Sequence, residues 1–278
     1  MRTLGMLILA SALLSTAAAA NNAFEDISAP SGSIPPENGP IWSAPDAAVL
    51  HNNGPLITNI GTCPGTPPNN NESQIRPGGT VFGFGHAVST GFRVADNFTV
   101  PAGQQWEIQS ITFFGYQTGA GTGAPTMNQV SLRLWLGRPG DASSVVICGS
   151  TTNNVLALSA FSGIYRTVNT APCPGATTRP IFSNVCTLPT GCLPCLPEGT
   201  YWLDWNTGGT LASGPWAPPV TPTPAGANAL QFSGTALTWG PLLDGTINED
   251  LPFIIEGVQC GATPVQGSTW GNIKGQYR

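Results

Sequence analysis

The chain has 278 residues and a formal net charge of −5, and only 8% of its residues are charged. Nucleic-acid binding needs clustered lysines and arginines, so this composition predicts no nucleic-acid partner. The 35 glycines and 27 prolines indicate many turns, while recurring apolar blocks argue against disorder.

Residues 1–20 have the pattern of a secretory signal peptide. Arg2 gives the positive start, residues 4–14 form an apolar run, and the alanines at 18–20 offer a cleavage site before Asn21. The run is about half the ~20 residues that a spanning helix needs, and no second run of that length follows. The sequence therefore predicts a secreted protein, extracellular or at the cell surface, without a transmembrane anchor.

Residues 21–53 are rich in proline, serine, alanine and asparagine, which predicts a flexible N-terminal arm. A single β-sandwich domain is expected over residues 54–262, with a loop at 61–79. Residues 263–278 are expected to form a C-terminal tail or a last strand.

Strands dominate the expected domain, and the two clearest show strict alternation of apolar and polar residues. Apolar blocks predict strands near residues 92–100, 106–114, 130–136, 145–148, 164–168, 180–188, 201–206, 229–232, 237–239 and 253–258. No amphipathic helix period occurs outside the signal. We therefore expect an all-β fold, an antiparallel β-sandwich or jelly-roll-like structure with long Gly/Pro-rich loops.

Seven cysteines follow the signal and predict a disulfide-stapled fold. They are Cys63, Cys148, Cys173, Cys186, Cys192, Cys195 and Cys260. The odd number leaves one thiol free or in an intermolecular bond. The spacing of Cys192 and Cys195 resembles a redox motif, but no helix or βαβ unit surrounds it, so structural disulfides are favoured. A zinc site built on Cys186, Cys192 and Cys195 is the alternative.

Several sequence blocks resemble uncharacterised secreted bacterial β-sandwich proteins. The blocks are RVADNFTVPAG from residue 93, YWLDWNTGG from residue 201, SGPWAPPV from residue 213 and PFIIEG from residue 252. The resemblance implies export and β architecture and carries over no catalytic residue. The terminal residues 268–278 also look like a tail found on other exported bacterial proteins.

Aromatic and polar residues gather in and after the strand at 201–206, which suggests a carbohydrate-binding surface. The candidates are Trp202, Asp204, Trp205, Asn206, Trp216 and Trp239. If Leu203 marks the core face of the strand, Trp202 points outward or into a second layer. The alternative is that these aromatics belong to the core.

Other chemistry has weaker support. Asp244, Asn248 and Asp250 form the densest oxygen cluster, a weak candidate for structural calcium, although the spacing is not that of an EF-hand. No other cofactor is expected. A glycosidase would need two converging carboxyls, and Glu107, Asp204 and Glu256 lie on predicted strands. The alternative for these carboxyls is a salt bridge with Arg133 or Arg166, or a solvated face.

Three functions follow from these patterns. The first is a non-catalytic extracellular structural or surface protein, which could self-assemble into an oligomer or filament by adding the N-terminal arm to a neighbour's sheet. The second is a carbohydrate-binding module with an extracellular glycan as its partner. The third is a glycosidase-type enzyme.

Overall fold

A computed structural model describes residues 47–63, 70–169, 177–189 and 191–261. The expected signal peptide, residues 21–46 of the arm, the C-terminal tail at 263–278 and Cys173 lie outside the described residues. All described residues belong to one compact unit, 42–278.

The described chain contains seventeen strands and one 3-10 turn, η1 (Val88–Thr90). The strands that form the two large sheets are β1 (Ala48–Asn52), β2 (Asn59–Cys63), β3 (Asn70–Gln74), β5 (Arg93–Val100), β6 (Trp106–Gly115), β7 (Met127–Leu136), β8 (Val145–Gly149), β9 (Leu156–Thr167), β10 (Pro180–Thr187), β11 (Gly199–Gly209), β13 (Leu230–Ser233), β14 (Thr238–Pro241) and β17 (Phe253–Gln259). Four two-residue strands complete the set: β4 (Phe84–Gly85), β12 (Trp216–Ala217), β15 (Leu243–Asp244) and β16 (Ile247–Asn248).

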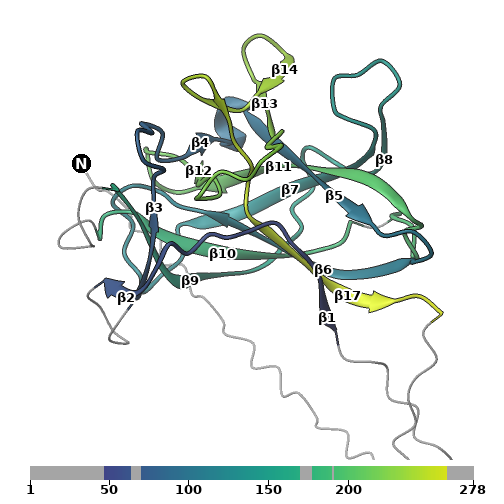
Figure 1. Ribbon diagram of the computed structural model, residues 1–278, viewed down its shortest axis with the longest axis horizontal. Coiled ribbons are helices and arrows are strands. Elements are labelled where there is room, and N and C mark those ends of the chain that lie inside the picture. Colours follow the sequence, from purple (N-terminus) through teal and green to yellow (C-terminus); the bar gives the residue numbers. More distant parts are fainter. Residues whose placement is uncertain (1–46, 64–69, 170–176, 190, 262–278) are drawn as a thin grey trace, which may run out of the picture. The chain divides into compact units, whose positions relative to one another are not determined.

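Two sheets make up most of the fold (Figure 1). A seven-stranded sheet has the order β1-β17-β6-β10-β9-β3-β2, and a six-stranded sheet has the order β14-β13-β5-β11-β7-β8. β4 pairs with β12, and β15 pairs with β16. All of these pairs are antiparallel except β3 and β9, which run parallel. The all-β prediction is confirmed. The predicted antiparallel pairing holds for these strands except β3 and β9, which run parallel.

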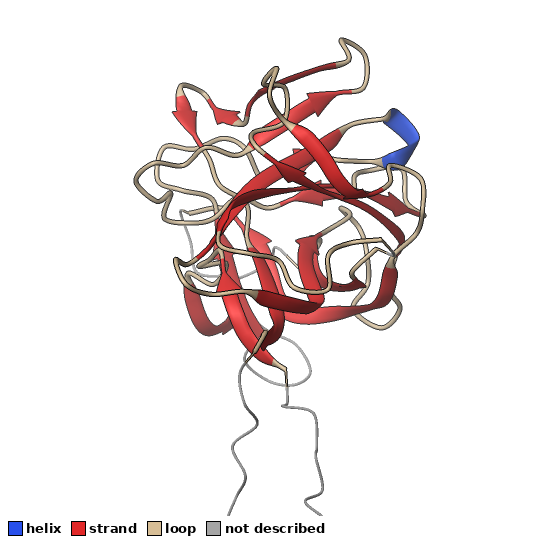
Figure 2. Cartoon of the chain, turned by 90° about the vertical axis from the view of Figure 1, so that its right-hand side faces the viewer, coloured by secondary structure: helices blue, strands red, loops and turns tan. Residues whose placement is uncertain are grey.

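The main core lies between the two sheets. It combines Phe98, Leu203 and Trp205 of the six-stranded sheet with Phe113 and Phe253 of the seven-stranded sheet. The Trp205 and Phe113 rings stack with centroids 4.4 Å apart. Figure 2 shows almost all of the described chain as strand and loop, with the short helical turn at the periphery. Because side chains alternate along each strand, one parity of each central strand fills this core.

Most predicted strands are found within a few residues of their expected positions, although β9 begins eight residues before the predicted start at 164. Seven strands were missed: β1, β2, β3 and the four two-residue strands. β1 lies inside the segment assigned to the arm, where it pairs with β17 at the edge of the sheet. β3 lies in the predicted loop at 61–79, and β2 overlaps its start. The arm therefore ends before Ala48 rather than at residue 53.

Buried polar groups hold the outlying segments onto the seven-stranded sheet. The fully buried Arg166 of β9 donates from Nε to the Phe82 carbonyl at 2.8 Å, and from Nη1 to Ser73 Oγ at 2.9 Å and the Gln74 carbonyl at 3.0 Å. It binds backbone carbonyls and a hydroxyl instead of the carboxylate expected from the sequence. Burial lowers the pKa of Arg166 to about 10, and the charges of Tyr116, Glu249 and Asp244 oppose that shift. A guanidinium has five N–H donors, which suits it to tie several chain segments together.

Candidate functional site

The predicted carbohydrate residues of β11 divide between the two faces of the six-stranded sheet. Leu203 and Trp205 point into the main core, and Trp205 is 1% exposed. Trp202 belongs to a separate aromatic cluster on the opposite face, as its parity predicts. Trp205 is therefore a core residue, and the structure corrects its assignment to a binding surface.

The outer aromatic cluster consists of Trp202, Ala95 and Leu230 with the half-buried Trp135 and Trp239 packed against them. Trp202 is only 5% exposed, so its ring is covered by the other members. Trp239 also packs against Phe232, with centroids 5.4 Å apart. Trp135, which sequence reasoning did not select, lies directly across from Trp202 in the β7–β11 pairing. In the sequence, Trp135 alternates with Leu134 and Leu136, and this pattern could have placed it on the opposite face from those leucines.

A loop from the far edge of the same sheet helps to cover this cluster. Gly140, between β7 and β8, lies against Trp239 of β14, and a Cβ at Gly140 would fall 3.2 Å from the Trp239 Cβ. The Gly140 φ of 94° is in the left-handed region, so glycine suits both the turn and the close approach. The curl of the sheet thus brings its two edges toward each other and buries the outer face.

Asp204 occupies the centre of this face and is fully buried. Arg93 Nε donates to Asp204 Oδ1, and Arg133 approaches Oδ2 from Nη2 at 2.6 Å and from Nε at 2.7 Å. Trp135 Nε1 also donates to Oδ2, at 3.1 Å. The expected bridge to Arg133 is present, whereas Arg166 lies elsewhere and Arg93 takes the second position. Two guanidiniums around one carboxylate make this a structural ion cluster.

Two further buried polar atoms lie beside the ion cluster. Arg93 Nη1 and Asn206 Oδ1 have no hydrogen-bond partner among the described residues. The register that pairs Trp205 with Val94 places Asn206 next to Arg93 on the outer face. Burial lowers the pKa of Arg93, and the charge of Asp204 opposes that shift. Asn206, predicted as a sugar ligand, is only 4% exposed and is covered like Trp202.

Trp216 lies away from the β11 cluster, on β12, beside a hollow of about 350 Å³. Trp216 and Phe92 form aromatic walls of the hollow, and Gln231 and Thr90 bring polar groups to it. The indole Nε1 donates to Ser213 Oγ at 3.1 Å, and the backbone N–H and carbonyl of Trp216 both pair with Tyr116. These bonds fix the orientation of the ring. None of the described lining residues is charged.

The three predicted calcium ligands bind protein donors or face solvent. Asp244, on the β15–β16 hairpin, accepts the Thr80 N–H at 3.0 Å and the Thr80 hydroxyl at 3.0 Å, and it lies 3.4 Å from Arg76 Nε. Burial raises the pKa of Asp244, but the bonds from Thr80 and the charge of Arg76 outweigh burial and leave it below its ordinary value.

Of the other two, Asp250 Oδ1 accepts the Asn228 N–H at 2.7 Å, and Asn248 is exposed. Across the described ranges, no group of three His, Cys, Asp or Glu side chains is arranged to hold a metal ion.

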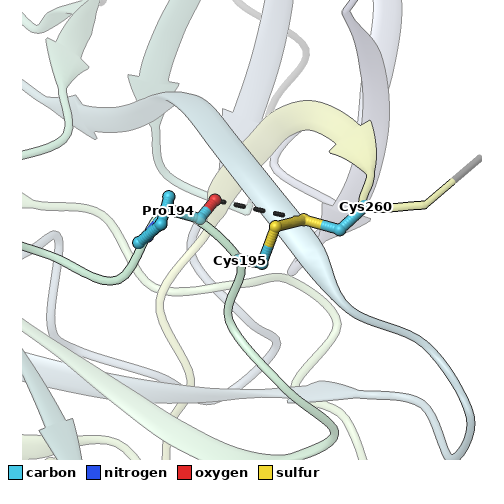
Figure 3. Close-up of a disulfide and its surroundings, with 3 residues drawn as sticks. All are labelled: Pro194, Cys195 and Cys260. Carbon is cyan, nitrogen blue, oxygen red and sulfur yellow. Dashed lines mark hydrogen bonds between the residues drawn. A yellow bond between two sulfur atoms is a disulfide. The ribbon is translucent and has the colours of Figure 1, made fainter.

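The cysteines of the Cys192–Cys195 motif do not bond to each other. Cys192 is joined to Cys148 of β8, and Cys195 is joined to Cys260 just after β17. The loop between β10 and β11 is therefore tied to both sheets. In Figure 3 the Cys260 sulfur faces the Pro194 carbonyl, 4.0 Å away. A disulfide sulfur has no hydrogen to donate, so this is a packing contact. The structural interpretation is confirmed, and the redox and zinc alternatives are excluded for this pair.

Two further cysteines, Cys63 and Cys186, lie among the described residues. Cys63 is disulfide-bonded, and Cys186 of β10 is a free, fully buried thiol. Burial raises the pKa of Cys186 to about 12, and its Sγ donates to the Asn184 carbonyl at 3.6 Å. The unpaired thiol expected from the odd count is thus enclosed in the core, where it cannot join a second chain.

Of the three carboxyls considered for catalysis, Asp204 is separate from the other two, whereas Glu107 and Glu256 lie on the paired strands β6 and β17. Asp204 belongs to the six-stranded sheet, whereas Glu107 and Glu256 belong to strands of the seven-stranded sheet. Glu256 accepts the Ser110 hydroxyl at 2.9 Å. His86 is buried, and burial lowers its pKa to about 4, despite a contact with the Phe84 carbonyl and with help from the charge of Arg93. Burial likewise lowers the pKa of His51, which contacts Phe98 and Phe253.

The described residues include no helix long and apolar enough to cross a membrane. Comparison with protein-family models, with curated proteins and with solved structures finds no match to this chain. The resemblance to exported bacterial β-sandwich proteins therefore stays a prediction from the quoted sequence blocks.

Proposed function

We propose that this protein is a secreted, non-catalytic structural protein of the cell exterior that self-associates by strand addition. The observation that carries the proposal is the free edge of β8, at the end of the six-stranded sheet. Exposed sheet edges pair readily with other strands, so soluble proteins protect them with lysine, proline, bulges or a covering segment. The sequence of β8, VVICG, contains neither charge nor proline.

The side chains along β8 favour association with another strand. Val145 and Val146 are 51% and 40% exposed, although they point to opposite faces. Leu136, the register partner of Val145, is 49% exposed and extends the apolar surface onto β7. One register shift, opposite Leu134 and Trp135, interrupts the pairing with β7.

The other sheet edges are better protected. β14 ends in Gly240 and Pro241, and proline cannot donate a ladder hydrogen bond. β1 pairs with β17 through a register shift between Val49 and His51. β2 pairs with β3 through a shift between Asn59 and Cys63. Bulges of this kind make an edge a poorer template for a further strand, and β8 carries one as well. The pair of exposed valines and the lack of proline therefore distinguish β8, not continuous pairing with β7.

The N-terminal arm is the proposed donor. Residues 21–29 contain no proline, whereas five prolines fall within residues 30–46. Proline-rich segments act as extended spacers of about 3.1 Å per residue, so this spacer could span about 50 Å to a neighbouring copy. In this arrangement residues 21–29 of one copy pair with β8 of the next. The resulting contact is head-to-tail and gives a filament or a ring.

Size-exclusion chromatography with light scattering and electron microscopy test the proposal on residues 21–278. We expect concentration-dependent assembly, which removal of residues 21–46 abolishes. Val146→Lys should also abolish assembly, because it adds a charge to the proposed edge at an exposed position. Leu158→Lys is the control, since Leu158 is 58% exposed and lies on β9 of the seven-stranded sheet, outside the proposed β8 edge.

The proposal fails if residues 21–278 remain monomeric throughout a dilution series. It also fails if assembly persists in both the truncated protein and the Val146→Lys variant. Loss of assembly in Leu158→Lys alone would place the interface on the seven-stranded sheet.

A further inference from the structure

We infer that the hollow beside Trp216 binds a neutral saccharide, a function separate from self-association. Its volume of about 350 Å³ lies within the ~300–1,000 Å³ range of ligand sites. The residues that line it come from β4, η1 and its flanking residues, β12 and its preceding loop, and β13. Figure 1 shows β4, β12 and β13 in the upper part of the domain, and β4 and β12 are paired.

The aromatic ring of Trp216 is fixed in place. Trp216 is half-buried, and its ring lies over Gly85, where an added Cβ would be 3.4 Å from the indole. Next to the five-membered ring of the indole, Gly214, at a φ of 92°, comes so close that an added Cβ would fall 2.7 Å from Trp216 Cδ1. Two glycines and the Ser213 bond therefore hold the indole in place before any ligand arrives. A preorganised ring loses little entropy on binding.

Two polar side chains of the hollow, Gln231 and Thr90, are oriented by hydrogen bonds to the backbone. Gln231 Nε2 donates to the Gly85 carbonyl at 2.8 Å, which orients the amide. Its Oε1 receives no hydrogen bond from the described residues and remains an acceptor at the hollow. Thr90 donates its hydroxyl to the Ala87 carbonyl at 3.1 Å, so its lone pairs remain available. Both groups can accept hydrogen bonds from ligand hydroxyls.

The absence of charge among the described lining residues favours a neutral ligand. The described lining residues are all neutral, and the nearest buried histidine, His86, has a pKa of about 4 and carries no charge at neutral pH. A charged ligand would lose hydration here without gaining an ion pair. Apolar walls with a few hydrogen-bond acceptors match a sugar ring, whose C–H faces pack on aromatics while its hydroxyls donate. The geometry thus favours a neutral saccharide over an acidic one, at a different place from the β11 aromatic cluster.

The test is binding of the mature full chain to an array of neutral and acidic glycans, followed by calorimetry with the best neutral oligosaccharide. Trp216→Ala should weaken binding about tenfold or more, because one stacking contact and its buried area are lost. Trp216 also packs against the Tyr116 cluster, so a second variant guards against misfolding. Ala212→Trp fills the hollow from an exposed lining position and should abolish binding while the far-UV spectrum is unchanged.

Trp239→Ala is the matched control, a half-buried tryptophan on the outer face of the six-stranded sheet, and should change affinity less than twofold. The inference is overturned if no neutral glycan binds, if acidic glycans bind more tightly, or if binding survives Ala212→Trp. Loss of binding in Trp239→Ala alone would also overturn it and assign the sugar to the outer face. These outcomes are independent of the oligomeric state, so they do not depend on the proposed self-association.

Discussion

Replacing Asp204 by asparagine should destabilise the protein by about 3–5 kcal/mol, the usual cost of removing one partner from a buried ion pair. Asp204 is fully buried, and the Arg93 and Arg133 side chains beside it are 4% and 22% exposed. Asparagine keeps the shape but leaves two guanidiniums without a counter-charge. For a domain of this size the loss corresponds to a fall in Tm of about 10 °C.

Urea denaturation followed by tryptophan fluorescence measures this change, since the chain has eight tryptophans. Asp141→Asn is the control, because Asp141 pairs with Arg138 at 3.6 Å on the surface, where the two side chains are 54% and 45% exposed. Exposed pairs contribute about 0–1 kcal/mol. If Asp204→Asn lowers the free energy of unfolding no more than Asp141→Asn does, the ion cluster is not a structural centre and the reasoning fails.

Three other outcomes follow from buried groups. The folded-state pKa of His86, about 4, lies below its unfolded value of 6.5, so its contribution is complete above pH 6.5 and declines as the pH falls toward 4. The free energy of unfolding should therefore fall by about 2 kcal/mol between about pH 7 and pH 5. A His86→Gln variant whose unfolding free energy keeps the same pH dependence would contradict this. Cys186 should resist a thiol reagent in the native protein and react with it in denaturant. Rapid labelling of the native protein would show that the Cys186 thiol is not enclosed in the core. Replacing Cys148 and Cys192 by alanine should cost up to about 4 kcal/mol from loop entropy across a separation of 44 residues, and an unchanged Tm would refute that role.

Sequence analysis found the strands whose buried side chains are apolar. β7 and β11 alternate clearly, so their positions and faces followed from period two, including the outward direction of Trp202. β3 was missed because its sequence is NNESQ, which reads as a loop. Its Glu72 is fully buried and accepts bonds from Asn59 at 2.8 Å and Thr167 at 2.6 Å. Only the neighbouring strands make burial of such a segment favourable, and no local pattern encodes those neighbours.

The sequence indicated which residue types the candidate sites contain, but not which of those residues lie together in space. Trp205 and Trp216 are close to Trp202 in sequence, yet the first belongs to the core and the second to a separate hollow. Phe92, just before β5, and Gln231, on β13, complete that hollow, and the pairing of β5 with β13 brings them together. The disulfide pairing could not be predicted from the sequence either, since six cysteines allow 15 connectivities. Spatial convergence depends on sheet order, which one sequence does not specify.

The pairing of β1 with β17 has a consequence for how the chain matures. The first strand of the described domain finds its partner at Ile254–Gly257, more than two hundred residues later. The Cys195–Cys260 bond also needs a cysteine beyond that last strand. A chain that emerges from a pore N-terminus first therefore cannot close this edge until almost all of the domain has emerged. Closure of the sheet and of that disulfide is therefore a late, long-range step in the folding of the domain.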